Sequence, residues 1–251
     1  MYMENSAALQ GWNVLVTRPE EQAQKLKELI VDAGGDAIAF PTIEVVPLEF
    51  EADNEVDLTQ YDVIIFVSRN AVNYFGDRVT PSVSGSTLLV SVGKGSAESM
   101  RSHGLRVDLQ PAHSIGSEGL LMMPQLLDMT DKKVLIVRGK GGRELLADTL
   151  AQRGAEVRYI EVYERALPSP SVMQCEQALM ANSIVCTSVE GVKNLGLLLQ
   201  DSLKILFDKP MLVMSERIRD YAASLGFEHV VVTNTSSDSA VIDQLTKMDI
   251  E

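Results

Sequence analysis

Positively charged side chains in this sequence follow two apolar stretches that are typical of buried strands. Arg18 comes directly after the predicted strand Asn13–Thr17, and Arg138 follows the predicted strand Lys133–Val137. Arg138 opens a glycine-rich turn, Gly139–Arg143, after which the pattern predicts a helix. Ligands of open α/β sheets usually bind beyond the carboxyl ends of the strands, so both arginines are candidates to bind an acidic ligand.

Hydroxyl side chains occupy positions where helices are expected to begin. Ser68 and Ser188 each follow a predicted strand directly. A hydroxyl at such a position caps the helix, while the free N–H groups of the first turn attract an anion. The complete set of candidate ligand-binding residues is Arg18, Ser68, Asn70, Gly93, Ser96, Arg138, Thr187, Ser188 and Ser215.

Each of these features also has a purely structural interpretation. A serine before a helix is often only a cap, a glycine-rich turn often serves only close packing, and an arginine after a strand often forms a surface salt bridge. Gly139–Gly142 matches neither of the common nucleotide-binding glycine patterns, and Gly93–Gly95 is followed by Glu98 where the dinucleotide pattern needs glycine. The sequence therefore does not support a nicotinamide or ATP site.

The stronger argument for a site is an internal repeat at an interval of 120 residues. The aligned segments are Val14–Arg18 with Val134–Arg138, Ile64–Ser68 with Ile184–Ser188 and, after a slip of two residues, Gly104 with Gly226. Constant register over such a distance indicates a duplication. Both copies then present the same polar groups at equivalent strand ends.

Short apolar stretches alternate with helical patterns along most of the chain. The expected strands are Asn13–Thr17, Ala37–Val45, Val63–Val67, Leu88–Val92, Arg106–Leu109, Lys133–Val137, Val157–Tyr163, Ile184–Thr187, Met211–Met214 and His229–Thr233. The intervening helices include Glu20–Ala33 and Arg143–Arg153, which end at Gly34 and Gly154 as helix C-termini favour. This alternation predicts an α/β fold with mainly parallel sheets, helices on both faces and roughly five strands per copy.

The composition limits the possible partners. The chain has 251 residues, enough for one large or two small α/β domains, and its net charge of −13 argues against a nucleic-acid partner. No apolar run approaches the roughly 20 residues of a membrane span, and the first residues do not resemble a signal peptide. We therefore expect a cytoplasmic protein with no membrane partner.

Neither the cysteines nor the histidines form a catalytic or metal-binding pattern. Cys175 and Cys186 lack metal-ligand spacing, and we expect free thiols. We expect structural roles for His103, His113 and His229, because none has the partners of a catalytic triad. The residues alone thus predict a two-lobed α/β protein that binds an anionic ligand, and they do not identify a reaction.

An ordered set of motifs resembles the uroporphyrinogen-III synthase family. The motifs are Val14–Pro19, Phe66–Val72, Arg138–Arg143, Val162–Arg165 and Thr187–Ser188. No single motif is specific, but the set spans almost the whole chain in the family's order. The chain departs from the family's usual Gly-x-Thr-Thr at Gly93–Ser96 and Ser215–Ile218.

The resemblance implies two flavodoxin-like lobes, each with a parallel five-stranded sheet, joined by a two-stranded ladder and with the active site in the cleft between the lobes. It also implies an interleaved chain. Residues 1–40 and 172–251 form one lobe, residues 49–162 form the other, and residues 41–48 and 163–171 connect them. The repeat alone would suggest two consecutive halves, and we adopt the interleaved arrangement.

The resemblance further implies a cofactor-independent lyase of haem and sirohaem biosynthesis. Such an enzyme dehydrates hydroxymethylbilane, a linear tetrapyrrole with eight carboxylates, and cyclises it to uroporphyrinogen III, inverting the last ring through a spiro intermediate. No metal is needed. Tyr163 matches the family tyrosine that assists loss of the hydroxyl group, as a hydrogen-bond donor or general acid, although a tyrosine at a strand end is also explained by packing. The candidate ligand-binding residues would line the cleft.

We expect a monomer whose substrate is handed over by the preceding deaminase. The alternative is a hinged two-lobe protein that binds or senses a small anion, because duplicated α/β lobes around a cleft also describe that class. The isomer formed from hydroxymethylbilane would distinguish the two.

Overall fold

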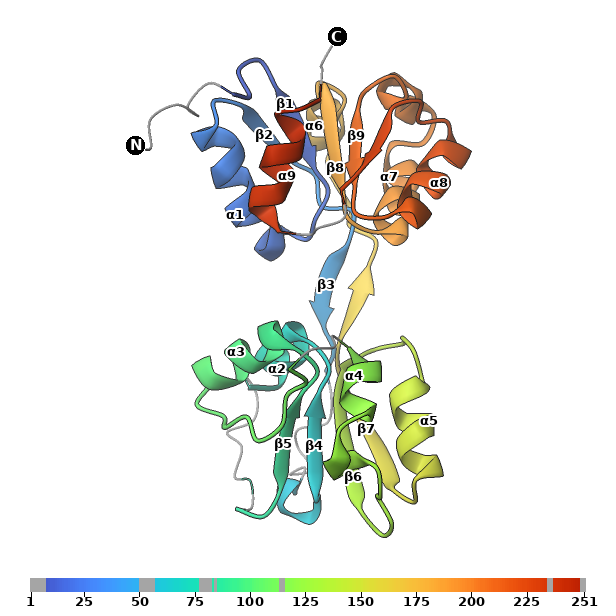
Figure 1. Ribbon diagram of the computed structural model, residues 1–251. Coiled ribbons are helices and arrows are strands. Elements are labelled where there is room, and N and C mark those ends of the chain that lie inside the picture. Colours follow the sequence, from blue (N-terminus) through green and yellow to red (C-terminus); the bar gives the residue numbers. More distant parts are fainter. Residues whose placement is uncertain are drawn as a thin grey trace, which may run out of the picture. The chain divides into compact units, whose positions relative to one another are not determined.

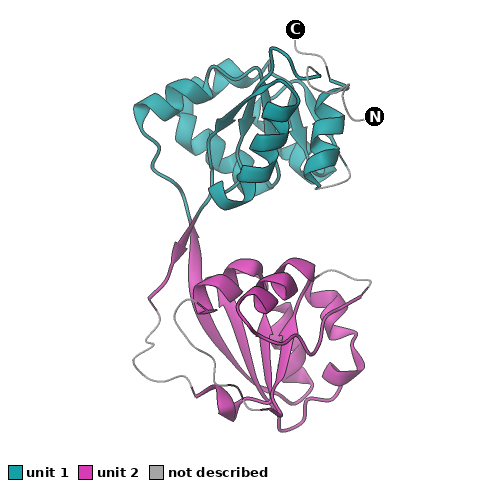
Figure 2. Cartoon of the chain, turned by 90° about the vertical axis from the view of Figure 1, so that its left-hand side faces the viewer, with its two compact units in different colours: residues 1–44, 166–251 teal, residues 45–165 magenta. Residues whose placement is uncertain are grey.

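The computed structural model describes residues 8–49, 57–76, 83, 85–112, 116–233 and 237–248. His113 lies outside these ranges. The chain divides into two compact units (Figure 2). Unit 1 contains residues 1–44 and 166–251, and unit 2 contains residues 45–165.

Unit 1 is built on a parallel sheet of five strands in the order β10-β9-β8-β1-β2 (Figure 1). The strands are β1 (Asn13–Val16), β2 (Asp36–Ala39), β8 (Ser183–Cys186), β9 (Met211–Val213) and β10 (Val230–Val232). Read from the other edge, this is the flavodoxin-like order. One face packs against α1 (Glu20–Asp32) and α9 (Asp238–Leu245). The other face packs against α6 (Val172–Ala178), α7 (Val189–Leu199) and α8 (Glu216–Leu225), with the 3₁₀ helix η3 (Gln200–Leu206) following α7.

Unit 2 is built on a second five-stranded sheet, in the order β3-β7-β6-β4-β5. The strands are β3 (Glu44–Pro47), β4 (Val63–Phe66), β5 (Leu88–Ser91), β6 (Lys133–Gly139) and β7 (Glu156–Ala166). The pairs β4–β5, β4–β6 and β6–β7 are parallel, whereas β3 runs opposite to β7 (Figure 1). The helices are α2 (Arg69–Gly76) and α3 (Lys94–Ser102) on one face, α4 (Ser117–Leu121) and α5 (Leu145–Gln152) on the other, and the 3₁₀ helices η1 (Leu58–Gln60) and η2 (Pro124–Leu126). The predicted α/β fold with two five-stranded, mostly parallel sheets is confirmed.

Sequence patterns explain why these elements form. The strands β4 and β8 are buried along their whole length, as expected for central strands covered on both faces. The helices α1 and α5 end two residues before Gly34 and Gly154, whose φ angles of 88° and 96° lie in the left-handed region that favours glycine. The predicted helix ends are therefore confirmed.

The sheet registers confirm the repeat. In unit 1, Val14 pairs with Ala37 and Ser183, and in unit 2, Val134 pairs with Val157 and Val63, so each pair is matched at an interval of 120 residues. The later slip of two residues also appears, because Ile64 pairs with Leu89 while Ile184 pairs with Met211. Each copy contributes strands to both units, so the repeats and the units do not coincide.

Two expected strands were wrong. The segment Arg106–Leu109 forms only an isolated bridge, Val90 with Leu109. The carboxylate of Asp108 accepts the N–H of Leu89 at 2.8 Å and occupies a donor that a ladder would use. The expected strand Ala37–Val45 is divided into β2 and β3, which belong to different sheets, and β3 supplies the fifth strand of unit 2.

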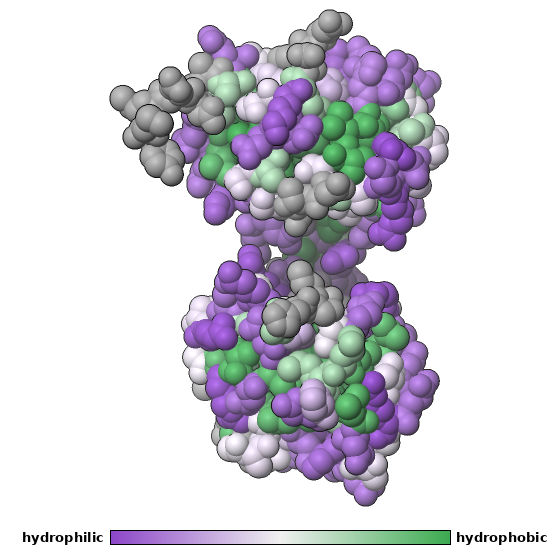
Figure 3. Space-filling model, viewed as in Figure 1, coloured by the Kyte–Doolittle hydropathy of each residue, from purple (hydrophilic) through white to green (hydrophobic). Residues whose placement is uncertain are grey.

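The surface of each unit is mostly hydrophilic, with apolar side chains scattered among polar ones (Figure 3). Met122, Val172 and Met180 are the most exposed large apolar residues of the described part. Scattered apolar residues are normal on a protein surface. In the described part of the chain, no helix is both long and apolar enough to cross a membrane.

Candidate functional site

In each unit, the strand order reverses between two central strands of the sheet. In unit 1 this point lies between β1 and β8, and in unit 2 between β6 and β4. The predicted residues Arg18, Thr187 and Ser188 follow the two strands in unit 1, and Ser68 and Arg138 lie at the ends of those in unit 2. Such switch points are where open α/β sheets usually bind ligands.

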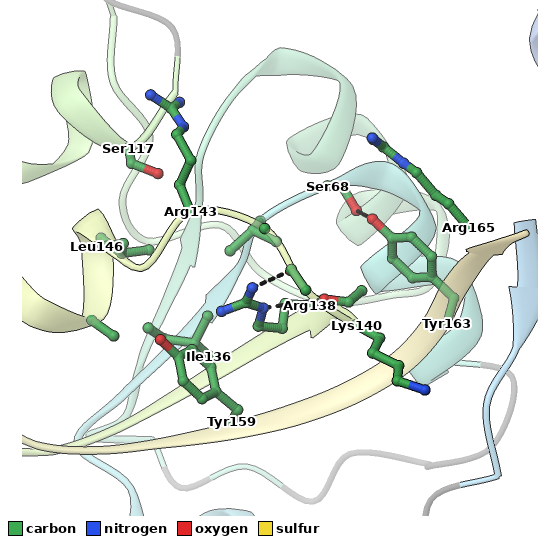
Figure 4. Close-up of a pocket in the computed structure, with 15 residues that line it drawn as sticks. Ser68, Ser117, Ile136, Arg138, Lys140, Arg143, Leu146, Tyr159, Tyr163 and Arg165 are labelled. Carbon is green, nitrogen blue, oxygen red and sulfur yellow. Dashed lines mark hydrogen bonds between the residues drawn. The ribbon is translucent and has the colours of Figure 1, made fainter. Parts of the chain in front are cut away.

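The described part of unit 2 has a pocket of about 340 Å³ at this switch point (Figure 4). Its lining residues are Val67, Ser68, Ser117, Ile136, Arg138, Gly139, Lys140, Gly141, Gly142, Arg143, Leu146, Ala147, Tyr159, Tyr163 and Arg165. Four of them are cationic and several carry hydroxyl groups, whereas none of these described lining residues is acidic. The pocket lining therefore offers cations and hydroxyl groups to an anionic ligand, while Arg138, Lys140 and Arg143 are paired with glutamates outside the lining.

Arg138 is buried and holds the glycine-rich loop that forms one side of the pocket. Its Nε donates to the carbonyl oxygen of Gly139 at 3.1 Å, and its other nitrogens donate to the carbonyl of Gly141 and, at 3.0 Å, to Glu144. The guanidinium also lies 4.6 Å from the ring centroid of Tyr159, a cation–π distance. Most of its donors are therefore used within the protein.

Tyr159 and Glu144 complete this arrangement. The Tyr159 hydroxyl donates to the Glu144 carboxylate. Burial, together with the hydrogen bond to Glu144, raises the pKa of Tyr159 to about 12. The hydrogen bond from Tyr159, and then Arg138, lower the pKa of Glu144 from its ordinary value. The three side chains therefore form one charge-assisted cluster at the base of the loop.

Tyr163 places a phenol hydroxyl in the pocket. The side chain is buried, and its oxygen lies 3.1 Å from the Ser68 hydroxyl oxygen (Figure 4). Ser68 in turn accepts the N–H of Ala71 at 3.0 Å and so caps α2, as predicted. The Tyr163 ring lies against Gly139, where an added Cβ would be 2.5 Å from two ring atoms.

The other predicted residues of unit 2 lie outside this pocket. Gly93 is the N-cap of α3, and the buried Ser96 hydroxyl donates to the Gly93 carbonyl oxygen at 3.0 Å. Asn70 is half-buried in the first turn of α2. Neither Ser96 nor Asn70 belongs to the pocket lining.

In unit 1, the predicted residues are distributed over three loops. Ser188 caps α7 by accepting the Gly191 N–H at 2.9 Å, beside the half-buried Thr187. Arg18 is buried and forms an ion pair of 2.5 Å with Asp238. Ser215 is the N-cap residue of α8 without a capping hydrogen bond from its side chain. Arg18 therefore resembles its repeat partner Arg138 in having an internal carboxylate partner.

Several pocket residues were missed by the sequence analysis. They are Ser117, Lys140, Arg143, Tyr159 and Arg165. Lys140 and Arg143 belong to the glycine-rich turn and Arg165 to a family-like motif, so their charge was an available signal. Ser117 and Tyr159 reach the pocket through tertiary packing and have no such signal in the sequence.

The structure describes the surroundings of both cysteines and of His103. Both thiols are free, and burial raises the pKa of the Cys186 thiol. His103 contacts the Ser99 carbonyl oxygen at 2.9 Å through Nδ1, a structural role. Within the described ranges, no cluster of three histidine, cysteine or acidic side chains could hold a metal ion.

These features define an α/β protein with two flavodoxin-like units and a cation-lined pocket at a topological switch point. The family model described as "Uroporphyrinogen-III synthase HemD" matches residues 24–243, and the chain belongs to this family. The uroporphyrinogen-III synthase of Escherichia coli K12 is 31% identical over 248 residues, which cover 93% of this chain and 99% of that protein.

Solved structures agree with the fold. The uroporphyrinogen-III synthetase of Helicobacter pylori is similar with a TM-score of 0.66 at 17% identity, covering 94% of this chain and 99% of that one. A mutant uroporphyrinogen III synthase of Thermus thermophilus gives a TM-score of 0.60 at 17% identity, covering 95% and 100%.

Proposed function

We propose that this chain dehydrates and cyclises hydroxymethylbilane to uroporphyrinogen III. The C–O bond of the hydroxymethyl group breaks, and its oxygen leaves as water with a proton from the enzyme. The substituted carbon of the last ring then attacks the resulting electrophilic carbon and gives a spiro intermediate. Rearrangement inverts the last ring, and loss of a proton restores the pyrrole, so loss of one water balances the reaction.

The observation that carries this proposal is the Tyr163 hydroxyl in a cation-lined pocket at the switch point of unit 2. A phenol at that position would donate a hydrogen bond or a proton to the departing hydroxyl group of the substrate. Cations around it attract carboxylate arms. The main task is positioning, because the linear substrate otherwise closes to the type I isomer without inversion.

We assign carboxylate binding to the exposed cations of the pocket and keep the predicted strand-end residues of both units as candidates. Support comes from the helix N-termini that follow these strands, whose N–H groups favour an anion. The Ser68 and Ser188 caps each satisfy one N–H donor of α2 and α7, so other donors of the first turn are left for a ligand. The candidates in unit 1 are Arg18, Thr187, Ser188 and Ser215, and those in unit 2 are Ser68, Asn70, Gly93, Ser96 and Arg138.

We further propose that the protein is a monomer, that it receives its substrate from the preceding deaminase and that it is located in the cytoplasm. The free thiols of Cys175 and Cys186 suit a reducing compartment. Sedimentation with and without the deaminase would test the first two points.

The proposal is tested by supplying the purified protein with hydroxymethylbilane and identifying the product isomer. Uroporphyrinogen III is expected, whereas formation of the type I isomer alone would contradict the proposal. A sensor or binding protein would bind the substrate and leave only the type I product.

A second test concerns Tyr163. Tyr163→Phe should slow turnover by about one to two orders of magnitude, because a general acid contributes about that much or more. An unchanged rate of type III formation would reduce Tyr163 to a packing role.

A further inference from the structure

We propose that Ser68 and Gly139 are positioning residues that fix the hydroxyl of Tyr163 in the pocket; this inference rests on the proposed function. Tyr163 lies in the C-terminal half of β7, in register with Gly139 at the end of β6, and Ser68 precedes α2, so three separate elements converge on one phenol. Neither Ser68 nor Gly139 needs to touch the substrate for this role.

Gly139 allows the Tyr163 ring to lie directly on the backbone of β6. A Cβ at this position would be 2.5 Å from Cε2 and Cζ of the ring and 3.0 Å from Cδ2. The ring also packs against Tyr74, with centroids 5.9 Å apart. Contacts with Gly139 and Tyr74 therefore restrict the rotation of the ring, and the hydroxyl can reach Ser68.

Ser68 connects this hydroxyl to the N-terminus of α2. Its oxygen accepts the Ala71 N–H at 3.0 Å and lies 3.1 Å from the Tyr163 oxygen. A serine hydroxyl has one donor and two acceptor sites, so the Ser68 proton remains available for the tyrosine. When Tyr163 gives its proton to the leaving hydroxyl group, Ser68 can turn its O–H to the phenolate oxygen. The Ala71 N–H polarises Ser68 throughout.

The duplication provides an internal comparison. Ser188, the repeat partner of Ser68, caps α7 in the same way in unit 1. At the same interval of 120 residues, however, Ile43 stands for Tyr163 and Pro19 stands for Gly139. The two units therefore share the capping serine, but not the tyrosine or the glycine. Tyr163 packed on Gly139 therefore has no counterpart at the repeat positions in unit 1. This difference is expected if the pair has a function beyond maintaining the fold.

A double-mutant cycle tests the role of Ser68. Ser68→Ala should lower kcat for type III formation by about tenfold, which is a larger effect than its change in KM, because it removes one hydrogen bond to the acid. In the Tyr163→Phe background, the same change should have little further effect. Ser68→Thr, which keeps the hydroxyl, should restore most of kcat.

The matched control is Ser171→Ala, which removes the N-cap of α6 in unit 1, where Ser171 accepts the Gln174 N–H. Ser171→Ala should leave kcat unchanged. The control therefore distinguishes the general effect of losing a helix N-cap from the specific effect on Tyr163. Equal losses from Ser68→Ala with and without the Tyr163 hydroxyl would overturn the proposal, as would failure of threonine to restore kcat in a folded variant.

A measurement without substrate separates this inference from the proposed function. In protein labelled with 3-fluorotyrosine, the ¹⁹F resonance that disappears in Tyr163→Phe belongs to Tyr163. Ser68→Ala should shift or broaden this resonance, and Ser171→Ala should not. An unaltered resonance refutes positioning, whereas a wild-type protein that yields only the type I isomer refutes the proposed function.

Discussion

Replacing Gly139 by alanine is expected to damage the pocket through one added methyl group. The new Cβ would lie 2.5 Å from the Tyr163 ring, and an ordinary contact requires at least 3.4 Å. The ring would have to move by about 0.9 Å, since Gly139 belongs to the buried end of β6 and its backbone is held in the sheet. Such a shift would also disturb the 3.1 Å contact between Tyr163 and Ser68.

Two magnitudes follow from this displacement. Overpacking a well-packed site typically costs about 1–3 kcal/mol of unfolding free energy. Misplacing a catalytic group by about 1 Å can reduce the rate by about 100-fold. We therefore expect Gly139→Ala to lose most of its activity and yet to remain folded at room temperature, since small domains have about 5–15 kcal/mol in reserve.

Urea unfolding and the rate of type III formation would be measured together. The matched control is Gly196→Ala in α7 of unit 1, where the added Cβ would make an ordinary contact of 3.7 Å with Leu203. This control should gain up to about 1 kcal/mol, because alanine favours helices over glycine. If Gly139→Ala kept wild-type activity, the reasoning about the close approach of Tyr163 would be wrong.

The remaining predictions concern the charged loop after β6. Arg143→Ala should raise KM several-fold and leave the free energy of unfolding nearly unchanged, because the pair of Arg143 with Glu118 is exposed. Arg138→Ala should lower the free energy of unfolding by about 2 kcal/mol, because the Arg138 side chain is buried. Steady-state kinetics and urea unfolding would measure these two effects. The lowered pKa of Glu144 means that its charged form stabilises the fold above the ordinary value of 4.5 and loses this effect as the pH falls through the folded-state pKa. The loss of stability in Glu144→Gln should therefore be present at pH 7 and shrink below pH 4.5, and urea unfolding that shows it growing in acid would contradict this sign.

The repeat predicted which strands are neighbours within each sheet, but not how the chain is divided into units. It requires equivalent strands to have equivalent neighbours, and the pairs Val14–Ser183 and Val134–Val63 satisfy this requirement in two separate sheets. Apolar periodicity also identified most strands, because buried parallel strands are continuously apolar. Local sequence could not show that Asp108 would use its side chain in place of strand pairing, because that contact is with Leu89, 19 residues away.

The sequence predicted which loop residues lie at the site, but it did not predict the side-chain contacts between them. Strand ends and helix caps are local features, so Ser68 and Arg138 could be placed at the carboxyl ends of strands from the sequence. The contact between Ser68 and Tyr163 joins residues 95 positions apart and depends on the register of β7 beside β6. Tyr159 is a partner of Arg138 for the same reason, and no local pattern distinguishes it from a surface tyrosine.

We propose different roles for the two kinds of cation in the pocket, because they differ in burial. The Arg138 side chain is 7% exposed and binds two backbone carbonyls, so removing it from the loop would leave those acceptors without their charged donor. Arg143 and Lys140 are 69% and 60% exposed, and their pairs with Glu118 and Glu164 are of the surface kind. Exposed pairs contribute only about 0–1 kcal/mol, so a substrate carboxylate can replace either glutamate at small cost. The buried arginine therefore shapes the loop, and the exposed cations on that loop are the ones able to exchange an internal carboxylate for one of the substrate.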